Sequence, residues 1–266
     1  MRDYSAELAF AIEAARSASG VAATFSGRTA SSEQKEDGTW VTEADLAAER
    51  AIRDHIRDAF PDHNVLGEED GLTAAIGGAP TPDAPTWVVD PIDGTNNFMR
   101  DIPIWATLVG LRLEGRMVVG VCHAPLLDEL YDGAEGMGAR RNGDPIHVDP
   151  VARLEDALFV FASGWNFIEG DFRDLYRSLA ERCRRSRGLG DFWGHMLVAR
   201  GAAHVMVEDT LKPWDVFPLL PIVSEAGGRI THLDGREWAG EGSCLTTNGA
   251  LHEEVLGLAR SHIATD

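Results

Sequence analysis

The sequence has few cysteines, few basic residues and no long hydrophobic run. Its three cysteines, Cys122, Cys183 and Cys244, lie far apart and form no CxxC pair. This spacing argues against a disulfide framework or a structural zinc site. No apolar stretch approaches the roughly 18 residues of a membrane span, and the charged N-terminal region lacks the apolar core of a signal peptide. We therefore expect a reduced, cytoplasmic protein with no membrane partner.

Basic residues are outnumbered, because 24 Lys and Arg stand against 43 Asp and Glu and give a formal net charge of −19. Nucleic acids and anionic membrane surfaces are bound by basic patches, so this excess of acid argues against both as partners. A small phosphate ligand remains compatible with the charge, provided that a cation lies between the phosphate and the acids. The 44% of hydrophobic residues is typical of a folded globular chain.

Histidine-based chemistry is also missing from the pattern. The nine histidines form no HExxH and no other spacing that is typical of metal ligands. We interpret four of them as surface or packing residues: His55, His63, His123 and His195.

Hydrophobic periodicity predicts a mixed α/β protein. Apolar residues at three- to four-residue spacing predict two amphipathic helices in the N-terminal region. Thr42 and Asp45 resemble a helix-start signature, and Phe60-Pro61 ends the second helix. The later segments expected to be helical are 171–182, 192–200, 215–226 and 251–259. The segments expected to be strands are 87–90, 104–113, 117–123, 158–162, 204–208 and 229–232. Residues 71–86, rich in Gly and Pro, are expected to form an exposed loop.

Acidic residues gather in three short segments, each at the end of an apolar strand or the start of a helix. They are Gly67-Glu68-Glu69, Asp90-Pro91-Ile92-Asp93-Gly94-Thr95 and Lys212-Pro213-Trp214-Asp215. Two unit charges about 4 Å apart repel by about 4 kcal/mol at an effective dielectric near 20, so clustered carboxylates need a neutralising partner. Ligation by oxygen alone suits Mg²⁺. The three segments therefore predict a site for divalent cations.

The central acidic segment can serve both a metal and a phosphate. Its proline stiffens the turn, so Asp90 and Asp93 can converge while the Ile92 carbonyl faces the same site. Gly94 lets a ligand approach the backbone, and the N–H groups of Gly94 and Thr95 would form an anion cradle at the start of a short helix. Alone, D-x-x-D-G-T also fits a loop of solvated acids. The flanking acidic segments, in this order, favour the metal and phosphate site.

These segments, together with Glu225-Ala226-Gly227-Gly228, resemble the signatures of the inositol monophosphatase-like family of Mg²⁺-dependent, lithium-sensitive phosphatases. The likeness runs from about Lys35 to Gly228 and extends in helix pattern to both ends of the chain. It implies the layered αβαβα sandwich of the inositol monophosphatase and fructose-1,6-bisphosphatase type. It also implies assembly as a homodimer.

The resemblance implies a single phosphatase domain over residues 1–266. A sub-lobe boundary is expected near Asp149-Pro150. Sub-lobe 1–150 would carry the metal and phosphate site, and sub-lobe 151–266 would carry the substrate side and the last metal ligand.

Carried over residue by residue, the resemblance implies two Mg²⁺ ions per subunit and a third, weaker site. The ligands of the first ion would be Glu68, Asp90 and the Ile92 carbonyl. Those of the second ion would be Asp90, Asp93 and Asp215. The third site would use Asp45, in a segment that begins at Lys35.

The same resemblance assigns the chemistry to Glu68, Asp90 and Thr95. Glu68 and Thr95 would orient a metal-activated water, and Glu68 would help to remove its proton. Asp93, Gly94 and Thr95 would bind the phosphate of a small phosphate monoester.

The substrate side is assigned to a second set of residues: Arg187, Asp191, Glu208 and Asp215. In the inositol enzymes the position of Glu208 holds an acid that binds the polyol, whereas that of Asp191 tends to be small or neutral. Two carboxylates beside the leaving group suit a cationic alcohol better than neutral inositol. The pattern R-x-x-G-D-F, with residues 102–108, resembles the histidinol-phosphatase subgroup, whose substrate carries an ammonium and an imidazole.

Three functions follow as hypotheses. The favoured one is a histidinol-phosphatase that converts L-histidinol phosphate to L-histidinol and phosphate. The second is an inositol-1-monophosphatase or broad sugar-phosphate phosphatase, and the third is a non-catalytic metal- or phosphate-binding protein. Two observations keep the alternatives open: Asp191 could only N-cap the following helix, and Thr95-Asn96-Asn97-Phe98 is closer to the inositol type.

Overall fold

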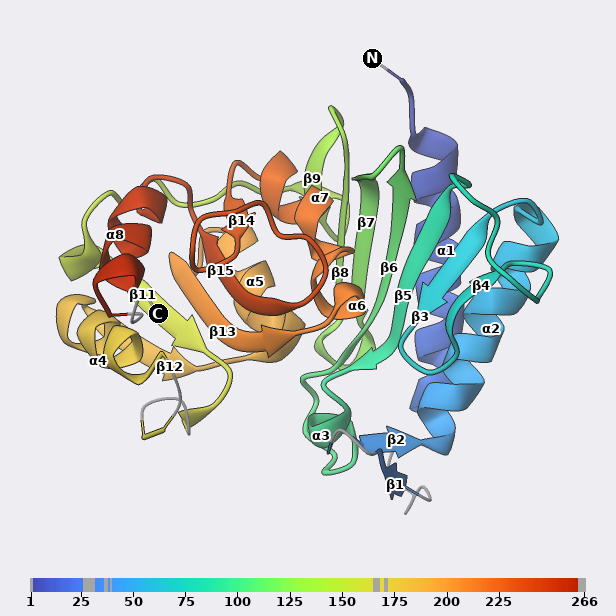
Figure 1. Ribbon diagram of the computed structural model, residues 1–266, viewed down its shortest axis with the longest axis horizontal. Helices are drawn as coiled ribbons and strands as arrows, with labels where there is room; N and C mark the ends of the chain where they lie inside the picture. Colours follow the sequence, from blue (N-terminus) through green and yellow to red (C-terminus); the bar gives the residue numbers. More distant parts are fainter. Residues whose placement is uncertain are drawn as a thin grey trace. The chain divides into compact units, whose positions relative to one another are not determined.

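The computed structural model describes residues 2–25, 32–35, 38, 40–164, 168–169 and 172–262. The chain divides into two compact units. The first comprises Met1–Asp144 and Trp214–Ile222, and the second comprises Pro145–Pro213 and Val223–Asp266. Each unit is a β-sheet with helices packed on it (Figure 1), so the expected mixed α/β class is confirmed. The sub-lobes expected from the sequence stay a prediction, and the compact units depart from them at residues 214–222, which belong to the first unit.

The first unit is built on an eight-stranded sheet with the strand order β10-β9-β8-β7-β6-β5-β3-β4. Its neighbouring strands from β5 to β9 pair antiparallel, whereas β3 and β5 run parallel. The strands are β3 (Asn64–Gly67), β4 (Gly71–Ala74), β5 (Thr86–Asp93), β6 (Ala106–Leu113), β7 (Arg116–Ala124), β8 (Glu129–Ala134), β9 (Gly138–Arg141) and β10 (Asp144–Pro145). A separate antiparallel pair is formed by β1 (Ser32–Gln34) and β2 (Trp40–Thr42).

Two long helices, α1 (Ser5–Ala23) and α2 (Glu43–Ala59), pack side by side on one face of this sheet (Figure 1). Their buried apolar residues form one core with inward-facing strand residues such as Val89 and Val109. The expected start of the second helix is confirmed, because the Thr42 side chain accepts from the backbone of α2 while the Asp45 carboxylate accepts from Thr42 N. This reciprocal capping box satisfies backbone donors that the first turn of a helix leaves unpaired.

Three glycines lie opposite one another on β6, β7 and β8: Gly110 pairs with Gly120, and Gly120 with Gly133. We call them the glycine stripe. Because Val119 and Val121 face the α1–α2 core, Gly120 between them faces the other side of the sheet. A Cβ atom on any of the three would collide with the segment 218–222. The stripe therefore lets this segment, which follows α6 (Pro213–Val216) and includes the start of α7 (Leu219–Glu225), lie directly on the strands.

The second unit is built on a five-stranded sheet with the strand order β12-β11-β13-β15-β14. Residues Val205 and Val207 share a core with α4 and α8, whereas Met206 packs with residues of α5. The alternation along β13 thus places α5 against one face of the sheet and α4 and α8 against the other. The strands are β11 (Leu158–Phe161), β12 (Arg185–Gly188), β13 (Val205–Leu211), β14 (Arg229–Thr231) and β15 (Gly242–Thr247), and the helices are α4 (Arg173–Arg182), α5 (Asp191–Ala199) and α8 (His252–His262).

Several expectations about single elements are wrong in part. Residues 71–86 are not all loop, since β4 pairs with β3 in a tight hairpin. The helix expected over 215–226 is two helices, α6 and α7. The start of the helix expected over 171–182 lies partly outside the described residues. Eight other described strands had no counterpart in the sequence analysis: β1, β2, β3, β8, β9, β10, β12 and β15.

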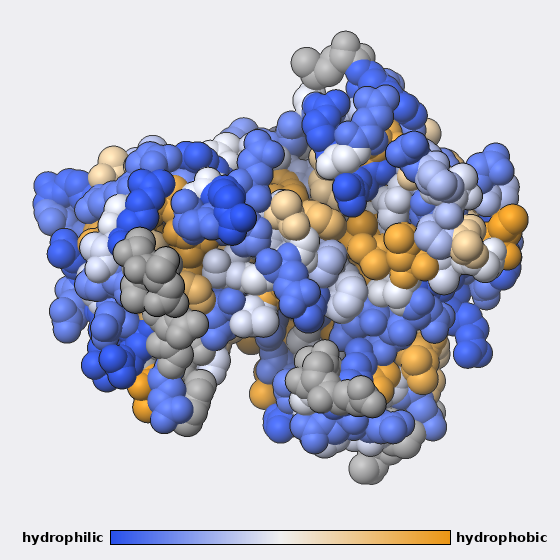
Figure 2. All heavy atoms as spheres, in the orientation of Figure 1, coloured by the Kyte–Doolittle hydropathy of each residue, from blue (hydrophilic) through white to orange (hydrophobic). Residues whose placement is uncertain are grey.

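The described surface agrees with the polar composition. In Figure 2 most of the visible face is hydrophilic, and hydrophobic side chains gather in small patches between larger hydrophilic areas. Among the described residues, every helix is too short or too polar to cross a membrane.

Candidate active site

The end of β5 and the start of α6 bring three carboxylates together in the first unit. One carboxylate oxygen from each of Asp90, Asp93 and Asp215 lies within 4.8 Å of the other two. A register shift in the pairing of β5 with β6 falls between Asp90 and Asp93, and such an irregularity lets two acids three residues apart face one point. The three residues predicted to share the second ion are therefore neighbours in the structure.

The Asp90 carboxylate is fixed and almost fully buried, with 1% of the residue exposed. The Ile92 N–H donates to Asp90 Oδ1 at 2.9 Å, while the Ile92 carbonyl accepts from the Thr95 hydroxyl at 3.0 Å. Burial raises the pKa of Asp90 well above its ordinary value, and the charges of Glu68 and Asp93 raise it further. A buried cluster with this much repulsion fits a divalent cation, which would neutralise it.

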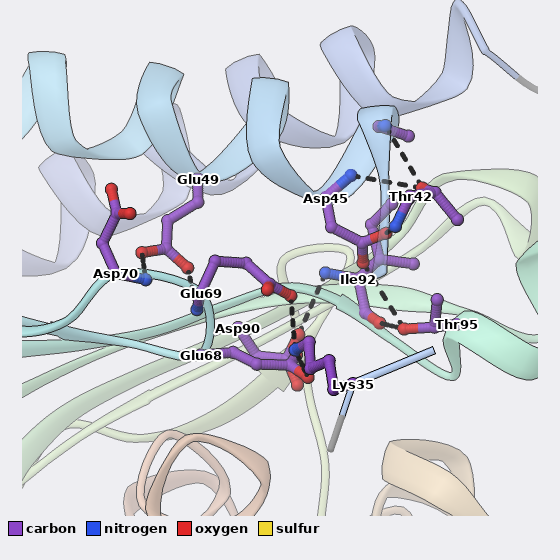
Figure 3. A network of polar contacts seen from close by, with 11 residues as sticks. Lys35, Thr42, Asp45, Glu49, Glu68, Glu69, Asp70, Asp90, Ile92 and Thr95 are labelled. Carbon is purple, nitrogen blue, oxygen red and sulfur yellow. Dashed lines mark hydrogen bonds and ion pairs between the residues drawn. The ribbon is translucent and has the colours of Figure 1, made fainter. Parts of the chain in front are cut away.

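Lys35 is the cation that the structure places beside these acids (Figure 3). Its Nζ donates to Oε1 of Glu68 and to Oε1 of Glu69, each at 2.9 Å. Burial raises the pKa of both glutamates to about 7, although the Lys35 charge opposes the rise. Burial lowers the pKa of Lys35 in turn, but the two carboxylates outweigh it and leave that pKa raised. The predicted first-ion ligand Glu68 is thus held next to Asp90 by a lysine.

Asp45 connects the capping box of α2 to the phosphate segment (Figure 3). Its Oδ2 accepts from the backbone and hydroxyl of Thr42, at 2.8 and 2.6 Å, and its Oδ1 accepts from the Thr95 hydroxyl at 3.4 Å. Burial raises the pKa of Asp45, while the bonds from Thr42 partly offset the rise. One oxygen of the predicted third-site ligand is therefore engaged in capping, and its role in metal binding stays a prediction.

Gly94 turns the chain between the last acid of β5 and the short helix α3 (Thr95–Phe98). Its φ of +89° lies in the left-handed region, where an L side chain is strained. A Cβ atom there would lie 3.0 Å from the Ile104 carbonyl oxygen. Both observations explain why glycine stands at this position, directly before the backbone predicted to bind phosphate.

Glu49 is a residue of this region that the sequence analysis missed. It lies on α2 with 1% of its surface exposed, and its carboxylate accepts from the N–H groups of Glu69 and Asp70 at 2.8 and 3.1 Å (Figure 3). Arg53 Nε also donates to it at 2.8 Å. Glu49 thereby fixes the turn that carries Glu68. The available signal was the four-residue spacing of Asp45, Glu49 and Arg53, which places them along one side of the helix.

The residues predicted to bind the substrate lie mainly in the second unit. Asp191 is the first residue of α5, and its φ of +53° is left-handed; the N-cap position belongs to Gly190. Glu208 lies on β13 with 4% exposed. Arg187 is exposed on the edge strand β12 and donates to the Ser186 carbonyl at 2.7 Å. The binding roles of these three residues stay predictions.

His195, expected to be a surface or packing residue, is buried and hydrogen-bonded at both ring nitrogens. Its Nε2 lies 2.8 Å from Glu208 Oε2, and its Nδ1 lies 2.7 Å from the Thr246 hydroxyl. No motif in the sequence indicates this contact, because α5, β13 and β15 are brought together only by folding.

Comparison with known proteins agrees with the geometry. The chain matches the Inositol monophosphatase family over residues 3–264. It is 41% identical to a histidinol-phosphatase of Streptomyces coelicolor over 85% of each chain, and 36% identical to inositol monophosphatase 3 of Solanum lycopersicum over 86% of each chain. Its structure resembles that of a Thermotoga maritima IMPase with a TM-score of 0.85 and 32% identity, over 97% of this chain and 98% of the other. The chain therefore belongs to the inositol monophosphatase family.

Proposed function

We propose that this phosphoric monoester hydrolase is a Mg²⁺-dependent histidinol-phosphatase, which converts L-histidinol phosphate to L-histidinol and phosphate. The enzyme class follows from the family, whose members generally depend on divalent metals. The observation that carries the proposal of a metal-dependent reaction is the buried cluster of Asp90, Asp93 and Asp215, because such a cluster is stable only with a cation or with protonated acids.

We assign the proposed metal ligands in the grouping expected from the sequence. One ion would be held by Glu68, Asp90 and the Ile92 carbonyl. A second would be held by Asp90, Asp93 and Asp215, with Asp45 at a weaker third site. When bound, the ions supply positive charge for the phosphoryl oxygens and the leaving alkoxide, and they acidify water.

The chain's own residues would position the reactants. Gly94 and Thr95 would hold phosphate with backbone N–H groups, beside Asp93. The Thr95 hydroxyl and the Glu68 carboxylate would orient the attacking water, and Glu68 would accept its proton. Lys35 would keep Glu68 in place through its 2.9 Å contact.

The choice of L-histidinol phosphate rests on the substrate side. Asp191 and Glu208 would offer two negative charges to the ammonium and imidazole of the leaving group. Arg187 and Asp215 are the other two residues proposed to bind the substrate. Asp191 begins α5, the helix that also carries His195, and His195 contacts Glu208. The identity of 41% to a protein named histidinol-phosphatase supports the same choice.

A second candidate is a phosphatase of inositol 1-phosphate or of several sugar phosphates. Two observations favour it: the 36% identity to a protein named inositol monophosphatase 3, and the inositol-type run Thr95-Asn96-Asn97-Phe98. A non-catalytic binding protein is disfavoured, because such a protein would have no physical need of the water-orienting pair Glu68 and Thr95.

A substrate panel tests the proposal. Phosphate release would be measured from L-histidinol phosphate, inositol 1-phosphate and fructose 1,6-bisphosphate, each with Mg²⁺ and with EDTA. We expect activity only with Mg²⁺. The kcat/KM for L-histidinol phosphate should be at least about tenfold above that for the other esters, because one additional charge-assisted contact contributes about this factor. Equal turnover of inositol 1-phosphate would overturn the substrate assignment. If no ester were hydrolysed, the assignment as a phosphatase would be overturned.

We further propose that the enzyme acts as a cytoplasmic homodimer, as the family resemblance implies. Its three cysteines are free and buried, which suits a reducing compartment. Light scattering on the purified protein tests the assembly: a mass twice that of the 28.8 kDa chain is expected, and a monomer at all concentrations would contradict it.

A further inference from the structure

A buried polar trio crosses the second unit from α5 to β13 and β15. It consists of His195, Glu208 and Thr246, which are 1%, 4% and 0% exposed. The distances are 2.8 Å from His195 Nε2 to Glu208 Oε2 and 2.7 Å from His195 Nδ1 to Thr246 Oγ1. No role in the reaction has so far been given to His195 or Thr246.

The chemistry of the trio fixes the direction of its hydrogen bonds. An ionised carboxylate only accepts, so His195 Nε2–H donates to Glu208. With its proton on Nε2, a neutral imidazole can only accept at Nδ1, and there the Thr246 hydroxyl donates. Glu208 thus selects the Nε2–H tautomer of His195, Thr246 satisfies the other ring nitrogen, and His195 fixes one oxygen of Glu208.

The other oxygen of Glu208 is left for a ligand. Oε1 accepts no hydrogen bond from any residue that the structure describes. Glu208 also ends the regular pairing of β13 with β15, because the register shifts between Glu208 and Leu211. The preceding residue on the same face, Met206, is fully buried against α5. Glu208 is therefore the point at which this face of β13 changes from apolar packing to polar contacts.

We propose that His195 is the positioning residue of the substrate pocket. It locks the Glu208 carboxylate through Oε2, so that Oε1 meets the polar group of the leaving alcohol. This inference rests on the proposed function, which makes Glu208 a substrate ligand. Because Asp191 lies one turn before His195 on α5, a single helix sets the positions of both acids that would recognise the cationic alcohol.

A purely structural role explains the trio less well. A buried ion pair or polar pair adds little net stability compared with apolar residues of similar volume. Gly194, the neighbour of His195, already packs against Met206, so an apolar side chain would continue that packing. The trio holds Oε2 of Glu208 and leaves Oε1 available to accept a hydrogen bond, an arrangement that is suited to ligand binding.

Two variants with similar amides separate the roles of the two ring nitrogens. The amide nitrogen of Gln reaches the position of Nε2, so His195→Gln keeps the donor to Glu208 and loses the contact to Thr246. The amide of Asn reaches only the position of Nδ1, so His195→Asn keeps the contact to Thr246 and loses the donor. Both variants, and Glu208→Gln, would be assayed with saturating Mg²⁺ on L-histidinol phosphate and on phenyl phosphate. The leaving group of phenyl phosphate carries no polar group besides its own oxygen.

We expect His195→Asn to raise the KM for L-histidinol phosphate about tenfold relative to that for phenyl phosphate, with a smaller change in kcat. His195→Gln should recover most of this loss. In the Glu208→Gln background, His195→Asn should add less than about a twofold effect, since the two residues act through one contact. Equal losses in the Asn and Gln variants, or equal losses on both esters, would overturn the inference.

The outcome is separable from that of the proposed function. If the wild-type enzyme does not prefer L-histidinol phosphate in the panel, the substrate assignment fails, and the same variants are compared on the preferred ester. The His195 inference predicts the same order there, because the hydroxyl of a polyol would also meet Glu208 Oε1. If His195→Asn does not fold, Thr246→Val serves instead. It removes the contact that holds His195 Nδ1, so the imidazole is less firmly placed and KM should rise about threefold; an unchanged KM would count against the inference.

Discussion

At the scale of single residues, the dominant feature is repulsion among buried acids. Asp90 is surrounded by the charges of Glu68, Asp93 and Asp215, each of which raises its pKa. Lys35 offsets part of this charge through its ion pairs with Glu68 and Glu69. A divalent cation would therefore stabilise the fold while it enables the reaction, so stability and activity should respond to metal together.

Removing one acid should separate these two effects. Asp93→Asn deletes a proposed ligand and one negative charge, so Mg²⁺-dependent activity should fall at least about 100-fold. The metal-free variant should be as stable as the wild type or more stable, because repulsion is relieved. Phosphate release with Mg²⁺ measures the activity, and thermal unfolding without metal measures the stability. Exposed Asp62→Asn is the control, and a variant at position 93 that keeps its Mg²⁺-dependent turnover would refute the two-ion assignment.

The raised pKa values of Glu68 and Glu69 predict a pH dependence of stability. Both groups have a pKa of 4.5 when unperturbed and about 7 in the fold. Between these values the folded protein holds more protons than the unfolded chain, so the free energy of unfolding of the metal-free protein should fall as the pH rises. Saturating Mg²⁺, which favours the ionised acids, should flatten the decline. Thermal unfolding from about pH 5 to about pH 8 measures it.

The histidine His252 has the opposite effect on the free energy of unfolding over part of this pH range. Burial lowers the pKa of His252 from 6.5 to about 4, so its contribution to stability rises with pH up to 6.5. Glu68→Gln is therefore the matched control, since it keeps His252 and should show a shallower decline above pH 6.5. A metal-free wild type that gains stability from pH 6.5 to about 8 would contradict the prediction.

Asp191 provides a test of substrate charge. Asn has the same shape and also tolerates the left-handed φ of this position, so Asp191→Asn removes charge with little change in backbone conformation. The KM for L-histidinol phosphate should rise about tenfold, whereas that for inositol 1-phosphate should change little. Steady-state kinetics on both esters decide the matter, and equal losses would point to a role in starting α5.

The acidic cluster was predictable from the sequence because part of its geometry is local, and the family resemblance implied the rest. Asp90, Ile92, Asp93 and Thr95 lie within six consecutive residues, whereas Asp215 joins them only through folding. Glu49 and His195 were not recognised, because their partners are distant in sequence and a buried Glu or His has no short motif. Their contacts with Asp70 and Glu208 exist only after α2 and α5 have packed on their sheets.

At the scale of elements, the glycine stripe positions the last acid of the cluster. Asp215 lies three residues before Pro218, and the backbone of Pro218 lies directly over Gly120. No side chain other than hydrogen fits between them. The placement of Asp215 next to β5 therefore depends on three residues that carry no functional group.

Gly120→Ala should disturb both stability and metal binding. The added methyl must displace Pro218, which should cost about 1–3 kcal/mol of unfolding free energy and lower the affinity for Mg²⁺ by moving Asp215. Denaturant unfolding and Mg²⁺ titration by calorimetry measure the two effects. Gly20→Ala in α1 is the control, since a Cβ atom there meets nothing within 4 Å, and it should be neutral or stabilising by up to about 1 kcal/mol. Unchanged Mg²⁺ affinity in Gly120→Ala would show that the stripe does not position Asp215.

Elements with clear periodicity were predictable, and short or polar ones were not. The helices α1 and α2 and the strands β5 to β7 follow their hydrophobic patterns. The strand β4 was missed because its neighbours are rich in Gly and Pro, and β12 because its sequence, Arg185–Gly188, is polar and lies at a sheet edge. Pairing with a neighbouring strand, rather than local preference, makes these segments extended.

At the scale of the whole molecule, the chain leaves the first unit after Asp144 and returns to it for Trp214–Ile222. Although the proposed ligands of both main ions come from distant parts of the sequence, all of them belong to this unit. The net charge of −19 is thus concentrated in part at one site, and the remaining acids contribute to the hydrophilic surface seen in Figure 2.

This distribution predicts where metal protects the backbone. Added Mg²⁺ should slow hydrogen exchange at the end of β5 and in residues 214–222, because it joins the two segments. The helix α8 and the strand β15, which belong to the second unit, should exchange as before. Mass spectrometry of peptides with and without Mg²⁺ measures the change, and protection confined to the second unit would contradict the assignment.

The return of residues 214–222 to the first unit also has a consequence for biosynthesis. A chain emerging from the ribosome exposes α1, α2 and most of the large sheet long before Asp215 has been translated. Until then the sheet face at Gly120 lacks the cover of Pro218, and the acidic cluster lacks Asp215. A polypeptide released prematurely before residue 214 would thus lack one proposed ligand of the second ion and would leave this sheet face uncovered, and chaperones and proteases could distinguish it from the finished enzyme.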